Sequence, residues 1–528
     1  MWGKRLAAAL AMIVGAAVLP IAVLAAPANN INDNDQLAAL AETSVPEAEV
    51  AAASSSQPNF VVIVSDDQRW DTVGRCSPTM DPFDFSSGED ACMPNLQALL
   101  QESGTTYLRG EVTQALCCPS RASILSGQYS TTTGITTNNG FPFDDSSTVA
   151  TWLNDAGYRT GLVGKYLNGY GSGPLSEYLP PGWDSFEAFH GLTNDESPYL
   201  DYTWISFDEG STTPEILDID DANSTSGEAC ADGNYYSTDY ICNRALDFIS
   251  ADTTTPFFAY LAPIAPHDPT TIADRHVNDF YGIGVTRYPS TNVAPSPNPP
   301  SYLPTQPFNS RNLDRVDRAR IGAIEATLAI DDMIGEIYDE LEADGRLDNT
   351  VWFFISDNGV STSEHLWKNK GWEYYDCHQV PYVVVCPPSV CPGAEGGTVD
   401  AENYVLNIDI APTVADLAGV TPTLTVDGLS LAPILSNPDA AWRDEWFIYG
   451  NDPHYDGIVG VGLDGTWYKY VVFPDVGEYE LYDEDNDPYE TINLAGNSAY
   501  AAVEADLAAR LAAHVGGEPP ANQDPSAA

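Results

Sequence analysis

Basic side chains are scarce in this chain of 528 residues, in which 21 lysines and arginines stand against 76 aspartates and glutamates. The formal net charge of −55 at pH 7 argues against binding to nucleic acid or to an anionic membrane surface. It suits a salt-adapted or otherwise harsh extracellular setting. Lysine is scarcer still, since the whole set is Lys4, Lys165, Lys368, Lys370 and Lys469. Lysines kept in so acidic a chain are not needed for solubility, so Lys165 and Lys370 are candidates for a functional role.

The length of the chain exceeds one ordinary domain, and no internal repeat is apparent. We therefore expect one large domain over residues 58–440 and a small α+β domain over residues 441–515. The apolar stretch 6–24 follows two basic residues and ends in small ones, which predicts a signal peptide over residues 1–25 and a secreted protein. A retained anchor helix is the alternative, because this stretch is nearly long enough to span a bilayer. Residues 26–57 lack apolar periodicity and predict a disordered linker, and residues 516–528 predict a disordered tail.

Cysteine is infrequent as well, and the nine cysteines suit an oxidising compartment. With Cys117 set aside, short spacings suggest three disulfides and leave Cys118 and Cys377 unassigned. Spacing alone does not fix the connectivity. The suggested pairs are Cys76–Cys92, Cys230–Cys242 and Cys386–Cys391.

Four apolar runs predict strands of one α/β sheet, over residues 60–64, 159–163, 256–261 and 351–355. Each run leads into polar side chains at its carboxyl end, which is where open α/β sheets bind their ligands. These side chains are Asp66, Asp67, Lys165, His267, Asp357 and Asn358.

Adjacent carboxylates that leave a core strand, as Asp66 and Asp67 do, are costly unless a cation neutralises them. A solvated turn is the alternative. Asp357 and Asn358 complete an all-oxygen ligand set with the first pair. Such a set favours Ca²⁺ over Zn²⁺, which prefers nitrogen and sulfur ligands.

Apolar residues at helical spacing predict a long core-facing helix over residues 315–341 that ends near Gly345. Residues 148–156 and 501–512 also predict helices, and residues 468–472 and 480–483 alternate like strands of a small antiparallel sheet. Residues 288–309 are rich in Pro, Ser and Asn, which predicts a long rim loop that shapes substrate access. His365 is either a rim residue or a surface residue.

A cysteine pair opens the stretch from Leu116 to Gly127. Pro119 suits the first turn of a helix and Gly127 suits the left-handed residue that ends one. The pattern predicts that Cys117 lies just ahead of a helix N-terminus, where backbone N–H groups favour an anion. The alternative is that Cys117 and Cys118 are half-cystines.

The string Cys117-Cys118-Pro119-Ser120-Arg121, followed by small residues, resembles the type I sulfatases. The longer string from Leu116 to Ser123 is close to the form seen in N-acetylglucosamine-6-sulfatases and extracellular heparan endosulfatases. The phrases Pro180-Pro181-Gly182-Trp183 and Pro266-His267-Asp268-Pro269 resemble the same family. The resemblance covers about residues 58–515. It implies an alkaline-phosphatase-like α/β fold, with a large mixed sheet flanked by helices and a small C-terminal antiparallel sheet.

The resemblance also implies roles for single residues. Cys117 would be converted to Cα-formylglycine, the nucleophile, by a formylglycine-generating enzyme. Arg121, Lys165 and Lys370 would neutralise the sulfate, Asp357 would help to deprotonate the nucleophile, and His267 would donate a proton to the leaving alcohol. One Ca²⁺ would be held by Asp66, Asp67, Cys117, Asp357 and Asn358.

Two positions bear on the assignment of these roles. Counting back from Val380-Pro381 aligns Lys370, rather than Lys368, with the sulfate-binding lysine of the family. Many sulfatases carry His two residues after the lysine that corresponds to Lys165. This chain has Leu167 there, which leaves the base for sulfate elimination unassigned.

The expected function is calcium-dependent hydrolysis of O-sulfate esters, with glucosamine 6-sulfate in a heparan-like glycan as the first candidate substrate. A phosphonate or phosphate diester hydrolase of the same fold is one alternative, although Asn358 stands where related phosphatases tend to have His. A non-catalytic glycan-binding protein, in which Cys117 stays a thiol, is the other.

Overall fold

The computed structural model describes residues 57–76, 84–85, 91–192, 198–207 and 209–516. The predicted signal peptide (1–25), the predicted linker (26–57) except its last residue, and the predicted tail (516–528) except its first residue lie outside the described residues. None of the helices in the described ranges combines the length and the apolar character that crossing a bilayer requires.

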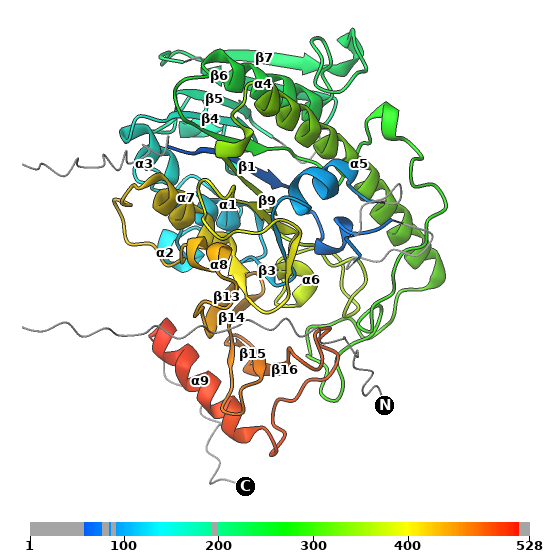
Figure 1. Ribbon diagram of the computed structural model, residues 1–528. Helices are drawn as coiled ribbons and strands as arrows, with labels where there is room; N and C mark the ends of the chain where they lie inside the picture. Colours follow the sequence, from blue (N-terminus) through cyan, green and yellow to red (C-terminus); the bar gives the residue numbers. More distant parts are fainter. Residues whose placement is uncertain (1–56, 77–83, 86–90, 193–197, 208, 517–528) are drawn as a thin grey trace, which may run out of the picture. The chain divides into compact units, whose positions relative to one another are not determined.

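A mixed sheet of ten strands forms the centre of the fold (Figure 1). Its central strands β9, β1, β8, β4 and β5 run parallel, and antiparallel strands flank them on both sides. The order across the sheet is β11 (Thr398–Asp400), β2 (Thr105–Tyr107), β10 (Tyr382–Val385), β9 (Thr350–Ser356), β1 (Asn59–Ser65), β8 (Phe257–Ala262), β4 (Arg159–Gly164), β5 (Ser185–Phe189), β6 (Asp201–Phe207) and β7 (Glu215–Asp220). The four predicted strands are therefore neighbours at the centre of the sheet.

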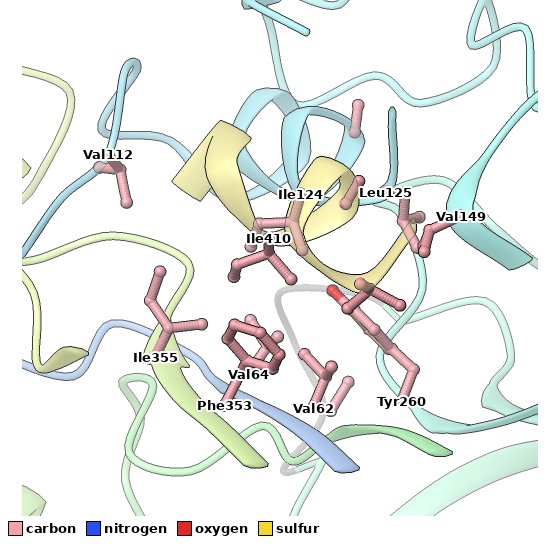
Figure 2. Packing of buried hydrophobic residues seen from close by; sticks show 14 of the residues in the cluster. Val62, Val64, Val112, Ile124, Leu125, Val149, Tyr260, Phe353, Ile355 and Ile410 are labelled. Atoms are coloured by element: carbon pink, nitrogen blue, oxygen red, sulfur yellow. The ribbon is translucent and has the colours of Figure 1, made fainter. Parts of the chain in front are cut away.

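Helices cover both faces of this sheet. Because successive strand residues point to opposite faces, Val62 and Val64 of β1 pack on one side and Val61 and Ile63 on the other. Figure 2 shows the first side, where Val62 and Val64 meet Ile124 and other apolar side chains. That side is covered by α1 (Cys117–Ser126), α3 (Val149–Asp155), α7 (Ile410–Ala418) and α8 (Ala432–Ser436), and the other by α4 (Ser237–Ala251) and α5 (Ser310–Ala343).

The long helix α5 begins at Ser310, five residues before the predicted start. Asn309 caps it, since its side chain accepts the Asn312 N–H at 3.0 Å. The first turn is polar and exposed, so the apolar pattern that predicts the helix starts only later. Gly345 has φ +68°, a left-handed conformation that favours glycine, and it lies just past the end of the helix as predicted.

A separate antiparallel sheet lies in the C-terminal region, drawn in orange and red in Figure 1. The helix α9 (Ala501–Val515) packs against it through apolar residues such as Leu507 and Leu511. Its strands are β13 (Glu445–Asn451), β14 (His454–Val461), β15 (Trp467–Phe473) and β16 (Glu478–Asp483). The remaining short elements are β3 (Gly110–Glu111), α2 (Ser130–Thr133), α6 (Tyr375–His378) and β12 (Val405–Leu406).

The three disulfides suggested by spacing are all present. They are Cys76–Cys92, Cys230–Cys242 and Cys386–Cys391. Cys117, Cys118 and Cys377 are free thiols and are buried. The alternative in which Cys117 and Cys118 are half-cystines is therefore wrong.

Candidate active site

Two carboxylates follow β1 at the carboxyl edge of the sheet. The strand ends at Ser65, and Asp66 is fully buried directly after it. The Lys165 Nζ lies 2.5 Å from Asp66 Oδ2, and the Lys370 ammonium pairs with the carboxylate of Asp67. Burying a carboxylate costs less when a cation lies beside it. Two of the lysines that this acidic chain keeps therefore neutralise the two adjacent acids.

Cys117 lies between these groups. Its Sγ is 3.5 Å from Asp66 Oδ1 and 2.8 Å from Lys370 Nζ. It was expected just ahead of a helix, but it is the first residue of α1, because Leu116 is the last residue with extended backbone. The side chain nevertheless projects from the N-terminal turn, as the motif predicts.

The start and end of α1 follow from its sequence. Pro119 occupies the first turn, where a missing N–H costs nothing, and Gly127 ends the helix with φ +69°. The backbone N–H of Cys118 donates to the Asn138 side chain at 3.0 Å. One of the N–H groups expected to be free for an anion is therefore occupied.

Arg121 connects α1 to the ends of three strands. Its Nε donates to Asp357 Oδ2 at 2.8 Å, one terminal nitrogen donates to the Lys165 carbonyl at 3.0 Å, and the other lies 3.9 Å from Asp66 Oδ2. The side chain has no exposed surface. Burial alone would lower the pKa of the guanidinium, but Asp357 and Asp66 raise it above its usual value, so the charge is kept.

Asn358 and His267 complete the group around Asp67. Asn358 Nδ2 donates to Asp67 Oδ1 at 2.7 Å, and His267 Nε2 lies 3.6 Å from Asp67 Oδ2. The His267 side chain is 33% exposed, unlike the buried groups beneath it. It therefore lies at the side from which solvent or a substrate enters.

Electrostatics set the protonation of two central groups. Burial would raise the pKa of the Asp66 carboxyl, but Lys165, His267 and Arg121 hold it well below its usual range. Burial raises the pKa of the Cys117 thiol to about 12, although neighbouring lysines act in the opposite direction. An unmodified Cys117 is therefore a neutral thiol at pH 7, and a neutral thiol is a weak nucleophile.

A candidate metal site lies at the same place. Four side chains each offer a ligand atom within 4.8 Å of the others, namely Asp66, Asp67, Cys117 and His267. Asn358 Oδ1 is buried and has no hydrogen-bond partner among the described residues. Asp357 lies beside this group, with its oxygens accepting from Arg121 Nε and from the Asp67 N–H at 3.1 Å. These oxygen donors fit a hard divalent cation.

The structure thus brings all the predicted site residues together, and their individual roles stay predictions. Leu167 is buried in the core and supplies no base. His365 is neither a rim nor a surface residue. It is buried, and its ring stacks on Tyr374 at 3.8 Å. Lys368 does not reach Cys117, and it lines a neighbouring cavity instead.

One buried network beside the site is absent from the motifs. Asp71 accepts hydrogen bonds from Arg69 Nε at 3.0 Å and from an Arg320 nitrogen at 2.6 Å, and Arg69 also pairs with Glu364 at 3.4 Å. It joins the loop after β1 to α5 and to the loop after β9. Its partners are far apart in sequence, so only the tertiary fold reveals it.

Comparisons with known proteins agree with this arrangement. The Sulfatase family model matches residues 58–420, and the model for the C-terminal part of N-sulphoglucosamine sulphohydrolase matches residues 363–515. The chain is 29% identical to the human (Homo sapiens) N-acetylglucosamine-6-sulfatase over 419 residues, which cover 75% of this chain and 68% of that protein. It is 28% identical to an extracellular sulfatase homolog of Drosophila melanogaster over 415 residues, 75% of this chain. The chain spans only 33% of that relative's length.

Solved structures share the fold. A protein in complex with its substrate D-glucosamine-2-N,6-O-disulfate has a TM-score of 0.66 and 22% identity, over 88% of this chain and 100% of that one. The phosphonate monoester hydrolase of Agrobacterium radiobacter has a TM-score of 0.62 and 22% identity, over 87% and 95% of the two chains. These likenesses confirm the predicted alkaline-phosphatase-like fold. Since the Sulfatase model matches more than half of its residues, the chain belongs to the sulfatase family, a family of sulfuric ester hydrolases.

Proposed function

We propose that this protein hydrolyses O-sulfate esters of a sulfated sugar, such as N-acetylglucosamine 6-sulfate in a glycan, with the help of one Ca²⁺. The observation that carries the proposal is the position of Cys117. It is the first residue of α1, and its Sγ lies 2.8 Å from the Lys370 ammonium. Arg121 and Lys165 add two further buried cations beside it. Relatives named N-acetylglucosamine-6-sulfatase favour this substrate class.

The nucleophile is made from Cys117 by a formylglycine-generating enzyme during maturation. When formed, Cα-formylglycine would supply a hydrated aldehyde, one hydroxyl of which would attack the sulfur of the ester as the alcohol leaves. Cleavage of the new C–O bond, with loss of the proton of the second hydroxyl, would then release sulfate and regenerate the aldehyde. Asp357 lies beside Arg121 at the end of β9 and helps to remove the proton of the attacking hydroxyl. The raised pKa of the unmodified thiol is compatible with a need for conversion.

A calcium ion fits the cluster of oxygen donors at the strand ends. Its ligands would be Asp66, Asp67, Asp357, Asn358 and the modified side chain at position 117. When bound, the ion withdraws electron density from a sulfate oxygen as a Lewis acid. The unpartnered Asn358 Oδ1 supports this assignment.

The protein's own cations handle the rest of the charge. Arg121, Lys165 and Lys370 neutralise the sulfate oxygens, and because Arg121 and Lys165 are buried these two act with little screening by water. His267 is partly exposed at the entrance and donates a proton to the departing alcohol.

The proposal extends to the domains and the location of the protein. We propose a catalytic domain over residues 58–440, a C-terminal α+β domain over residues 441–515, and a secreted location after removal of residues 1–25. The relatives named as extracellular sulfatases support the location. The partners are a sulfated carbohydrate and the maturation enzyme.

Two measurements test the proposal. The tryptic peptide from Gly110 to Arg121 should carry the mass of an aldehyde in place of one thiol, and Cys118 should keep its thiol. The matured protein should hydrolyse nitrophenyl sulfate faster than the matched phosphate diester and phosphonate. A faster reaction on either phosphorus ester would favour the phosphonate or phosphodiester hydrolase, and an unmodified peptide would favour the non-catalytic glycan-binding protein.

A further inference from the structure

A cavity of about 270 Å³ lies beside Asp67. Its volume is near the lower end of ligand sites, which are roughly 300–1,000 Å³. One wall is apolar and comes from Ala319, Ala323 and Ile324 of α5. The other walls come from the segment after β8 and from the loop that ends at Asn369. The cavity therefore adjoins the proposed sulfate site and has the size for about one sugar ring.

Most of the charge around this cavity is already neutralised. Arg69 and Arg320 line it, but both guanidinium groups are paired with the buried carboxylate of Asp71. Glu364 Oε1 lies 3.4 Å from Nη2 of Arg69. Asp67 is paired with a lysine, as described above. These groups hold the walls in place and offer no unbalanced charge to a ligand.

Lys368 is different, because it is exposed and lines the cavity without an ion pair to any described residue. Lys165, Lys370 and Lys469 are each paired with a carboxylate. Lys368 has no such partner within the part of the chain that the structure describes. In a chain with 76 acidic residues an unpaired lysine beside the active site is an exception.

The loop that carries Lys368 is held by its own contacts. Ser361 and Asn369 exchange two backbone hydrogen bonds of 2.9 Å. Trp367 donates its backbone N–H to the Glu364 carbonyl at 2.8 Å, and its ring packs on Trp372 at 4.2 Å. The backbone on both sides of Lys368 is thus fixed, and only its side chain is free. A fixed backbone lowers the entropy cost of binding a ligand.

We propose that Lys368 is a specificity-determining residue, which binds a second anionic group of the substrate while the scissile sulfate lies at Cys117. This inference rests on the proposed sulfatase function. The second anion is either an N-sulfate on the same sugar or the carboxylate of a neighbouring uronate. Asp268, an exposed acid that lines the cavity from the segment after β8, repels an anion and accepts a hydrogen bond from a sugar hydroxyl. The anion is therefore directed to the Lys368 side of the cavity.

The test compares matched substrates on the matured protein. One pair is glucosamine 6-sulfate with an N-sulfate or with an N-acetyl group, and the other is a disaccharide 6-sulfate with a free uronate or with its methyl ester. Within at least one pair the wild type should prefer the anionic member. Lys368→Gln should lower that ratio of kcat/KM by about tenfold, the scale of a partly exposed ion pair with a hydrogen bond. The pair that responds identifies the source of the anion.

Three further variants sharpen the result. Lys368→Arg should keep the preference and Lys368→Glu should reverse it. Arg311→Gln, two turns before Ala319 on α5, removes one exposed positive charge outside the cavity wall and should leave the ratio unchanged. If the kcat/KM ratios stay the same in Lys368→Gln, or if the wild type shows no preference in either pair, the inference about Lys368 is overturned and the proposed function is not. A matured wild type that releases no sulfate from any of the four substrates would overturn the proposed function, and this inference with it.

Discussion

Replacing His267 by alanine should slow hydrolysis of a sulfated sugar far more than hydrolysis of nitrophenyl sulfate. The His267 backbone is held independently of its imidazole, because its N–H donates to the Ile264 carbonyl at 2.9 Å and the Tyr199 hydroxyl donates to its carbonyl at 2.7 Å. The imidazole is 33% exposed. The free energy of unfolding should therefore change by about 1 kcal/mol or less.

The size of the effect depends on the leaving group. A sugar alkoxide is a strong base that needs a proton as its bond to sulfur breaks, whereas a nitrophenolate leaves without one. General-acid help is worth about 10²–10⁴-fold and should disappear for the sugar only. Loss of the partly exposed contact between His267 and Asp67, at 3.6 Å, should slow both substrates alike, by about fivefold at most.

The assay measures kcat/KM for sulfate release from glucosamine 6-sulfate and for nitrophenol release from nitrophenyl sulfate. In His267→Ala the ratio of the two values should fall by about 10²-fold or more. His454→Ala, an exposed histidine on β14, is the matched control and should leave the ratio unchanged. If His267→Ala slows both substrates by the same factor, His267 holds the sulfate or the fold and is not the acid.

Three further predictions concern the nucleophile, the metal and a buried acid. Cys117→Ala should abolish sulfate release while Cys118→Ala keeps much of it, and equal loss in two folded variants, checked by circular dichroism, would contradict the assignment. Chelation should abolish turnover and Ca²⁺ should restore it, whereas recovery with Zn²⁺ alone would refute the oxygen-ligand site. Burial raises the pKa of the Glu480 carboxyl from 4.5 to about 7, although the Tyr302 and Tyr482 hydroxyls donate to it. The free energy of unfolding should therefore fall as the pH rises across that range, because the folded state still binds a proton that the unfolded chain has lost. In urea unfolding at several pH values, Glu480→Gln should flatten this slope relative to Glu478→Gln, and an unchanged slope would be evidence against a protonated Glu480.

The strand ends of the site could be predicted from local sequence. The run from Phe60 to Val64 is apolar at every position, as a strand buried on both faces requires, and the acids directly after it can lie only at the carboxyl edge of the sheet. The same reasoning places Lys165 and Asp357. Lys370 differs, because its loop has no periodic pattern. The scarcity of lysine makes it a candidate, and the alignment with a known family favours it over Lys368.

Other features depend on contacts that local sequence does not encode. The pairing of Arg320 with Asp71 joins residues 249 positions apart. The sequence does not decide between a rim and a surface position for His365, because nothing in its neighbourhood shows that the Tyr374 ring covers it. The fold likewise brings carboxylates to Lys165, Lys370 and Lys469 and leaves Lys368 without an ion pair among the described residues. Each case depends on which distant segment packs against the residue, and that is a property of the tertiary fold.

The most direct test of the central claim is sulfate release from N-acetylglucosamine 6-sulfate by the protein produced with and without a formylglycine-generating enzyme. The account predicts that only the matured protein releases sulfate, in proportion to the fraction of Cys117 found as the aldehyde in the peptide from Gly110 to Arg121. Equal release by protein in which Cys117 is entirely unmodified, or no release of sulfate from this or any other sulfated sugar by the fully converted protein, would contradict it.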